Sequence, residues 1–115
     1  MLDKVNSVYE LIAKEYGISI AIEDPSINLS IGTTSLIIAQ NNPRRLGLVI
    51  INLSTNVLYV KPGGSATTTS GIRLAASGGS VSVNFITDLH LPALEWQAIA
   101  SGAASAIYIT SVVIK

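Results

Sequence analysis

The chain has 115 residues, of which 12% are charged and 49% are hydrophobic, and its seven acidic side chains balance its seven basic ones. This length predicts a single domain, and no apolar run approaches the roughly 18 residues of a membrane-spanning helix. A neutral chain without cysteine also argues against a nucleic-acid partner, a disulfide framework and a thiolate zinc site. With so little charge, either small polar side chains cover the surface or part of it is buried against other copies or partners.

Residues 3–16 predict an amphipathic helix. Asp3 can accept hydrogen bonds from the free amides of the first turn, and Gly17 offers the left-handed position that ends many helices. An apolar stripe recurs at helical spacing and comprises Val5, Val8, Tyr9, Ile12 and Tyr16. Because a helix this short is marginally stable alone, we expect residues 1–17 to anchor to a neighbour, to bridge neighbours or to pack on their own domain.

Charge is distributed unevenly along the chain. Residues 1–32 carry a net charge of −3, and residues 33–115 carry +3. An acidic N-terminal segment followed by a basic remainder of the chain favours head-to-tail docking between subunits, although only fourteen charges are involved.

After Gly17 the pattern becomes that of β-strands. Apolar and polar residues alternate over residues 18–22 and 27–31, and further segments follow between Gly-, Pro- and Asn-rich turns. These further segments are residues 34–39, 46–53, 57–61, 80–86, 96–100 and 106–114. The pattern predicts an all-β domain over residues 18–115, an antiparallel β-sandwich or barrel of the jelly-roll kind with one short N-terminal amphipathic helix.

The segment at residues 46–53 does not alternate. Leu48 and Ile50 point to one face and Val49 and Ile51 to the other, so both faces are apolar. The outer face of an antiparallel sandwich is normally polar. We therefore expect Val49 and Ile51 to be covered, either by the N-terminal helix or by a second subunit.

No motif calls for an enzyme. His90 is the only histidine and Asp88 lies two residues before it, but no nucleophile elbow accompanies them, so a solvated histidine is the better interpretation. Glu23 and Asp24 are too few ligands for calcium and suit the capping of a turn. Residues 62–71 lack the lysine of a phosphate-binding loop and predict a flexible connection. We expect no catalytic residue, cofactor or metal.

Three side chains are better suited to structural contacts than to catalysis or ligand binding. The paired Arg44 and Arg45 at the start of a strand suit bridges to carboxylates or backbone carbonyls at a loop or subunit contact. Trp96, the only tryptophan, is interpreted first as a core residue and second as an interface anchor.

The order of several short motifs is more specific than any one of them. An Asn-Pro turn with paired arginines leads into an apolar strand ending near asparagine, and a tyrosine strand, a Gly-Ile-x-Leu segment, a Gly-Gly turn and a Gly-Ala-rich hairpin follow. This succession resembles the small β-sandwich domain of virion proteins from tailed bacteriophages and related viruses. The matching residues, within residues 33–114, are Asn42, Pro43, Arg44, Arg45, Gly47, Asn52, Tyr59, Gly71, Ile72, Leu74, Gly78, Gly79 and Gly102.

The chain departs from that pattern in two places. Residues 88–96 form a longer and more apolar link than usual, and residues 3–31 are additional. The resemblance therefore leaves the position in the virion open.

The resemblance implies a non-enzymatic structural protein that packs as a homo-oligomer, for example a trimer. It would lie in the virion after synthesis in the host cytoplasm, as capsid decoration, head–tail or tail accessory, or fibre base. Other virion proteins are expected partners, and nucleic acid and membrane are not. The candidate subunit-interface residues are Val5, Val8, Ile12, Tyr16, Arg44, Arg45, Val49 and Ile51.

An alternative function is a binding module whose loops recognise a cell-surface glycan or protein. Glycan sites present exposed aromatic rings beside acids or amides. The obvious aromatic candidates, Trp96 and Tyr59, fall inside predicted strands. Solvent-exposed Trp96 would favour this alternative, and a shielded Trp96 would weaken it.

Overall fold

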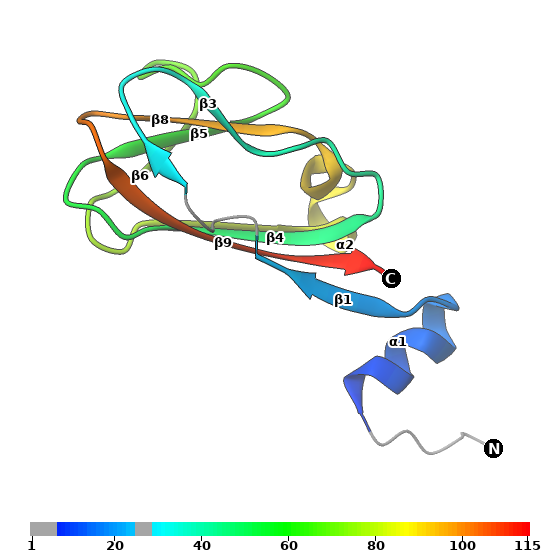
Figure 1. Ribbon diagram of the computed structural model, residues 1–115. Coiled ribbons are helices and arrows are strands. Elements are labelled where there is room, and N and C mark those ends of the chain that lie inside the picture. The colour runs from blue at the N-terminus through cyan, green and yellow to red at the C-terminus, as the bar shows by residue number, and fades with distance from the viewer. Residues whose placement is uncertain (1–6, 25–28) are drawn as a thin grey trace.

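The computed structural model of the protein describes residues 7–24 and 29–115. Its regular elements form two stacked β-sheets, with one helix before them and two short helical turns near one end (Figure 1). The elements are α1 (Val8–Tyr16), β1 (Ile20–Glu23), β2 (Ser30–Ile31), β3 (Leu36–Ala39), β4 (Arg45–Asn52), β5 (Leu58–Pro62), β6 (Ile72–Leu74), β7 (Ser80–Asn84), α2 (Phe85–Asp88), the 3₁₀ turn η1 (Leu91–Ala93), β8 (Trp96–Ala100) and β9 (Ser105–Ile114).

The strand order identifies a jelly roll. One sheet has the order β1-β9-β4-β7, with β2 also paired to β9, and the other has the order β3-β8-β5-β6. The antiparallel pairs β2–β9, β3–β8, β4–β7 and β5–β6 therefore nest inside one another, as in a long hairpin folded over on itself. The two sheets are not closed into a barrel. The predicted all-β antiparallel sandwich with one short helix is confirmed, in its two-sheet form.

The hydrophobic core lies between the two sheets. Trp96 at the start of β8 is completely buried, and its indole N–H donates a hydrogen bond to the Leu91 carbonyl at 3.0 Å. The interpretation of Trp96 as a core residue is confirmed. Other fully buried apolar side chains come from both layers and include Ile31, Leu48, Ile50, Leu58, Val60, Leu74 and Ile109.

Helix α1 begins one turn later than the sequence predicted. The hydroxyl of Ser7 accepts a hydrogen bond from the Glu10 amide at 3.2 Å and thereby caps the first turn. Gly17 ends the helix with φ +68°, and its amide donates to the Ala13 carbonyl at 2.9 Å, as predicted for this glycine. The predicted cap Asp3 lies outside the described residues.

The strand predicted over residues 80–86 ends two residues early. The side chain of Asn84 accepts hydrogen bonds from the amides of Ile86 and Thr87, both at 3.0 Å, and so caps the single turn α2. Phe85 therefore belongs to α2 and not to the strand. The alternation of Val81, Val83 and Phe85 led us to predict a longer strand, because the capping role of Asn84 is seen only in the folded chain.

Strand β6 was not predicted. It has only three residues, and of these Leu74 alone is buried. Its pairing with β5 matches Leu58 to Leu74 and Tyr59 to Arg73. So short a strand carries too little alternation to be recognised from its own residues.

Candidate functional site

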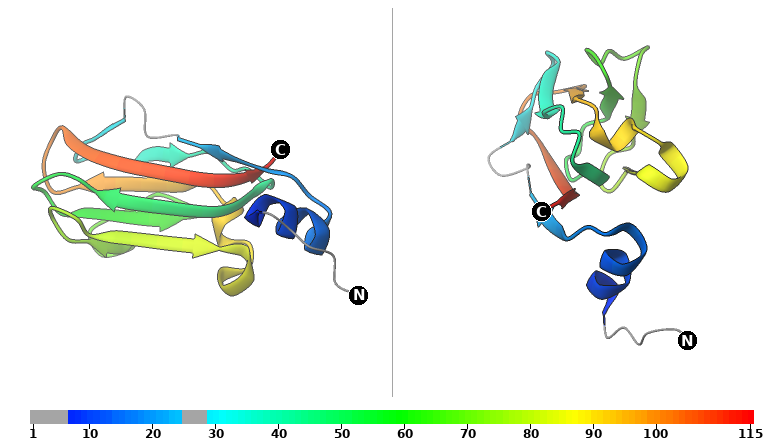
Figure 2. Two further views of the ribbon diagram at one scale, coloured as in Figure 1. Left: turned by 90° about the horizontal axis from the view of Figure 1, so that it is seen from below. Right: turned by 90° about the vertical axis from the view of Figure 1, so that its right-hand side faces the viewer.

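The outer surface of the β1-β9-β4-β7 sheet is the main feature that the core does not explain. In β4, Leu48 and Ile50 are buried between the sheets, whereas Val49 and Ile51 face outward and are half-buried. The prediction that β4 is apolar on both faces is therefore confirmed. Within the described residues, the second sheet lies on one side of the sheet that contains β4, and no strand layer lies on the other side (Figure 2).

Strands β9 and β1 extend this apolar surface. Outward residues of β9 alternate with buried ones, and antiparallel pairing places Ile22 beside Val112 and Ile20 beside Ile114 on the same side. The Ile22 side chain is 68% exposed. We call this surface the outer face and define it by the residues Ile20, Ile22, Val49, Ile51, Tyr108, Val112 and Ile114.

Two shallow hollows form one groove along the outer face. One, of about 240 Å³, lies where α1 meets the sheet, and Ile12, Tyr16 and Phe85 are among its walls. The other, of about 260 Å³, lies over Val49. The residues common to both are Gly47, Asn84 and Val112. We call the joined hollows the apolar groove.

The end of α1 closes one end of this groove. The rings of Tyr16 and Phe85 meet edge to face, with centroids 5.6 Å apart and planes at 84°. Ile12, one turn earlier, is half-buried and lines the same hollow. Tyr16 and Ile12, both predicted interface residues, are thus brought together with the outer face of their own chain.

Helix α1 keeps apolar side chains exposed at both of its ends. Val8 is 68% exposed, Leu11 is 46% exposed and Tyr16 is 53% exposed. The helix lies at one end of the sandwich and diverges from it toward its first residues (Figures 1 and 2). Val5, predicted as part of the same stripe, lies outside the described residues.

Arg45 points into the molecule. Its side chain is only 5% exposed, and its guanidinium donates to the carbonyls of Gln40 at 3.0 Å, Pro92 at 3.2 Å and Leu94 at 3.3 Å. The pKa of Arg45 is lowered, because the effect of burial is larger than the opposing effect of the Glu23 carboxylate. The sequence predicted that Arg45 lies at a loop or at a subunit contact. In the structure its guanidinium binds loop carbonyls of its own chain.

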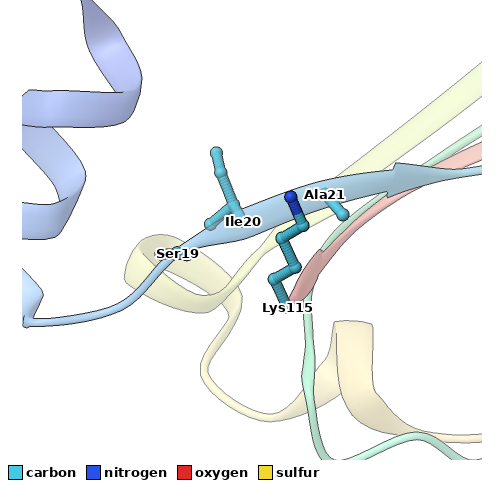
Figure 3. A pocket seen from close by; sticks show the side chains of 4 residues that line it. All are labelled: Ser19, Ile20, Ala21 and Lys115. Atoms are coloured by element: carbon cyan, nitrogen blue, oxygen red, sulfur yellow. The ribbon is translucent and has the colours of Figure 1, made fainter.

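Arg44, by contrast, is exposed. Its Nε donates to the Ile114 carbonyl at 3.2 Å and its Nη2 to the Lys115 carbonyl at 2.9 Å, so it fastens the end of β9. An open hollow of about 440 Å³ is lined by Ser19, Ile20, Ala21 and Lys115, whose side chain reaches across toward β1 (Figure 3). This hollow offers one cation and little else to hold a ligand.

The remaining polar candidates do not assemble into a site. Asp88 accepts hydrogen bonds from the Asn84 amide at 2.9 Å and the Thr87 hydroxyl at 3.1 Å, which places it in the turn α2. His90 follows that turn and is exposed. Over residues 7–24 and 29–115, no three histidine, cysteine, aspartate or glutamate side chains gather where they could hold a metal.

Two contributors to the outer face were missed from the sequence. Tyr108 and Val112 occupy outward positions of β9. The signal was present in residues 106–114, where both alternate rows contain apolar residues. The test for two apolar faces was applied to β4 alone, so the same feature in β9 was missed.

Comparisons with protein-family models, with curated proteins and with solved structures found no match to this chain. In the part of the chain that the structure describes, no helix is both long and apolar enough to cross a membrane. The outer face and its groove are therefore interpreted from their own chemistry.

Proposed function

We propose that this chain is a non-enzymatic structural subunit of a virion that packs as a homo-oligomer. The observation that carries the proposal is the apolar outer face, which the described part of the chain covers only in part. The virion setting is supported by the resemblance of residues 33–114 to small virion sandwiches. The jelly roll agrees with this role but does not single it out, because capsid proteins, lectins and cupins all use it.

Assembly through the outer face is energetically reasonable. Fully burying a valine or isoleucine side chain stabilises by about 1.5–3 kcal/mol relative to leaving it exposed. Val49, Ile51 and Ile22 are only partly covered in the single chain, so each retains a fraction of that gain for a contact with a neighbour. Contiguous exposed apolar surface on a domain often marks an interaction site.

Replacing Val49 with aspartate is expected to disperse the oligomer. The new carboxylate would have to be buried without a partner at the centre of the contact, which opposes association strongly. Light scattering at a fixed protein concentration should give the mass of an oligomer for the native chain and of a single chain for Val49→Asp. Ile51→Asp is also expected to give the mass of a single chain.

Thr68→Asp is the matched control, because Thr68 is exposed in the loop between β5 and β6, two strands of the sheet that does not contain β4. It adds the same charge and should leave the oligomeric mass unchanged. A native chain that is monomeric and soluble would contradict the proposed function.

The binding-module alternative depends on exposed aromatic rings. Trp96 is completely buried and its indole N–H is bound to the Leu91 carbonyl. We expect acrylamide to quench the fluorescence of Trp96 only weakly in the folded chain and fully in urea. Strong quenching of the folded chain would show an accessible Trp96 and would favour recognition of a glycan or protein.

A further inference from the structure

Two buried polar atoms find no hydrogen-bond partner among the residues that the structure describes. They are Nε of Arg45 and the hydroxyl oxygen of Ser111, in residues that are 5% and 1% exposed. Burying a polar group without a partner costs stability, so folded proteins pair nearly all such groups with another group of the chain or with ordered water. Both atoms therefore require an explanation.

Strand pairing makes these two residues neighbours on the core side of one sheet. Ser111 lies opposite Leu48 and Arg45 lies opposite Val113, and all four residues are buried. Arg45 and Ser111 are thus diagonal neighbours across β4 and β9, a relation that places Cα atoms roughly 7–8 Å apart. The side chains of Leu48 and Val113 are apolar and offer neither a donor nor an acceptor.

The guanidinium of Arg45 is held in place by its other nitrogens. Nη1 donates to the carbonyls of Pro92 and Leu94, and Nη2 donates to the carbonyl of Gln40. Because the guanidinium is planar and rigid, these bonds also fix the direction of its Nε–H. The Ser111 hydroxyl, by contrast, can rotate to donate or to accept.

Glu23 is a third polar group at the same place. Its partner in the pairing of β1 with β9 is Ser111, so the two side chains lie on the same side of the sheet. The Glu23 carboxylate acts to raise the pKa of Arg45, against the larger effect of burial, although the three carbonyls that Arg45 binds belong to other residues. We call Glu23, Arg45 and Ser111 the inner polar cluster.

The charges of the inner polar cluster select a neutral ligand. The guanidinium repels a cation and the carboxylate repels an anion. The Nε–H needs an acceptor and the carboxylate needs a donor, so the ligand must do both. Water is the smallest molecule of this kind, and buried water is held by two to four polar groups. With two hydrogen bonds of about 2.8 Å, one water joins atoms roughly 5 Å apart, a span that suits diagonal neighbours.

We propose that Arg45, Ser111 and Glu23 bind one ordered water on the core side of β1, β9 and β4. The water accepts a hydrogen bond from Arg45 Nε and donates one to the Glu23 carboxylate, and the Ser111 hydroxyl supplies its third contact. It thereby links the edge strand β1 to β4, with which β1 does not pair. The link lies within one chain and goes beyond the proposed function, because it does not depend on oligomer formation.

A crystal structure of the full chain at high resolution tests the site directly. The expected result is one water at hydrogen-bond distance, about 2.7–3.2 Å, from Arg45 Nε, Ser111 Oγ and a carboxylate oxygen of Glu23. A direct hydrogen bond from Nε to the Ser111 hydroxyl would overturn the proposal. Apolar side chains that fill the space between these atoms would overturn it as well.

Hydrogen exchange of the β1 amides tests the link in solution. Glu23 is exposed, so Glu23→Ala leaves the core intact and removes only the acceptor on β1. We expect the amides of residues 20–23 to exchange about tenfold faster in this variant, because β1 then opens more readily. Glu15→Ala, which removes an exposed carboxylate from α1, is the matched control and should leave these rates unchanged.

Glu23→Gln separates the water from a simple attraction between charges. The glutamine side chain keeps an oxygen that accepts a hydrogen bond from the water but carries no charge. Exchange of the β1 amides should therefore stay close to that of the native chain. Exchange as fast as in Glu23→Ala would show that charge attraction alone holds β1, and unchanged exchange in Glu23→Ala would show no link at all. Either result would overturn the proposal.

Discussion

Replacing Asn52 with alanine is expected to lower the free energy of unfolding by about 3–5 kcal/mol, a large part of the 5–15 kcal/mol typical of a domain. Asn52 is completely buried, and its amide nitrogen donates to the carbonyls of Asn56 at 2.7 Å and of Leu74 and Ala75 at 3.1 Å. Its side-chain oxygen accepts from the amide and the hydroxyl of Ser54 at 2.9 and 2.7 Å.

The size of this effect follows from where Asn52 lies. It ends β4 in one sheet, whereas Leu74 ends β6 in the other, so a single side chain fastens the two layers. Alanine would leave carbonyls without donors in the interior, and the desolvation cost of such groups is larger than the net gain of an ordinary hydrogen bond. Urea unfolding at fixed protein concentration measures the change.

Asn41→Ala is the matched control, because Asn41 is exposed before β4. Its effect should stay within about 0.5 kcal/mol, as for most surface substitutions. A loss below about 1 kcal/mol for Asn52→Ala would contradict the role of Asn52 as a link between the sheets.

Arg45→Ala is expected to lower the free energy of unfolding by about 3–4 kcal/mol, because three carbonyls lose a buried charged donor. Those carbonyls belong to Gln40, Pro92 and Leu94, so Arg45 ties β4 to the segments before it and before β8. Arg45→Lys should recover only part of the loss, because an ammonium cannot reproduce the planar fork of a guanidinium. Urea unfolding again provides the measurement.

The neighbouring arginine provides the comparison for this prediction. Arg44 also donates to two backbone carbonyls, but it is exposed, and water can replace it there. Arg44→Ala should therefore cost less than about 1 kcal/mol. Equal losses for the two variants would show that burial does not set the contribution of Arg45.

The pair of arginines shows why part of the candidate site could not be predicted. The residues Arg44 and Arg45 are alike in sequence, and both were assigned to a contact. The register between β4 and β9 shifts between Arg45 and Gly47, and with this irregularity Arg45 lies inside the molecule. A bulge depends on how two distant strands pair, which no local pattern contains.

The helix and the outer face were predicted more successfully. Val8, Ile12 and Tyr16 follow helical spacing, and Val49 and Ile51 follow the period of two residues in a strand, so both surfaces could be found from neighbouring residues alone. That Tyr16 meets Phe85, and that Val49 lies between Ser82 and Thr110, depends on segments far apart in the chain.

The sequence by itself determined the class of the domain, most of its strands and the unusual apolarity of β4, because alternation and turn residues are local properties. The tertiary structure decided which strands pair, how the pairs nest into a jelly roll and where the groove lies. It also decided which of two adjacent arginines is buried and that the side chain of Asn52 links the two sheets. These features arise from contacts across long separations, where pairing, bulges and burial select one arrangement among many that the local pattern allows.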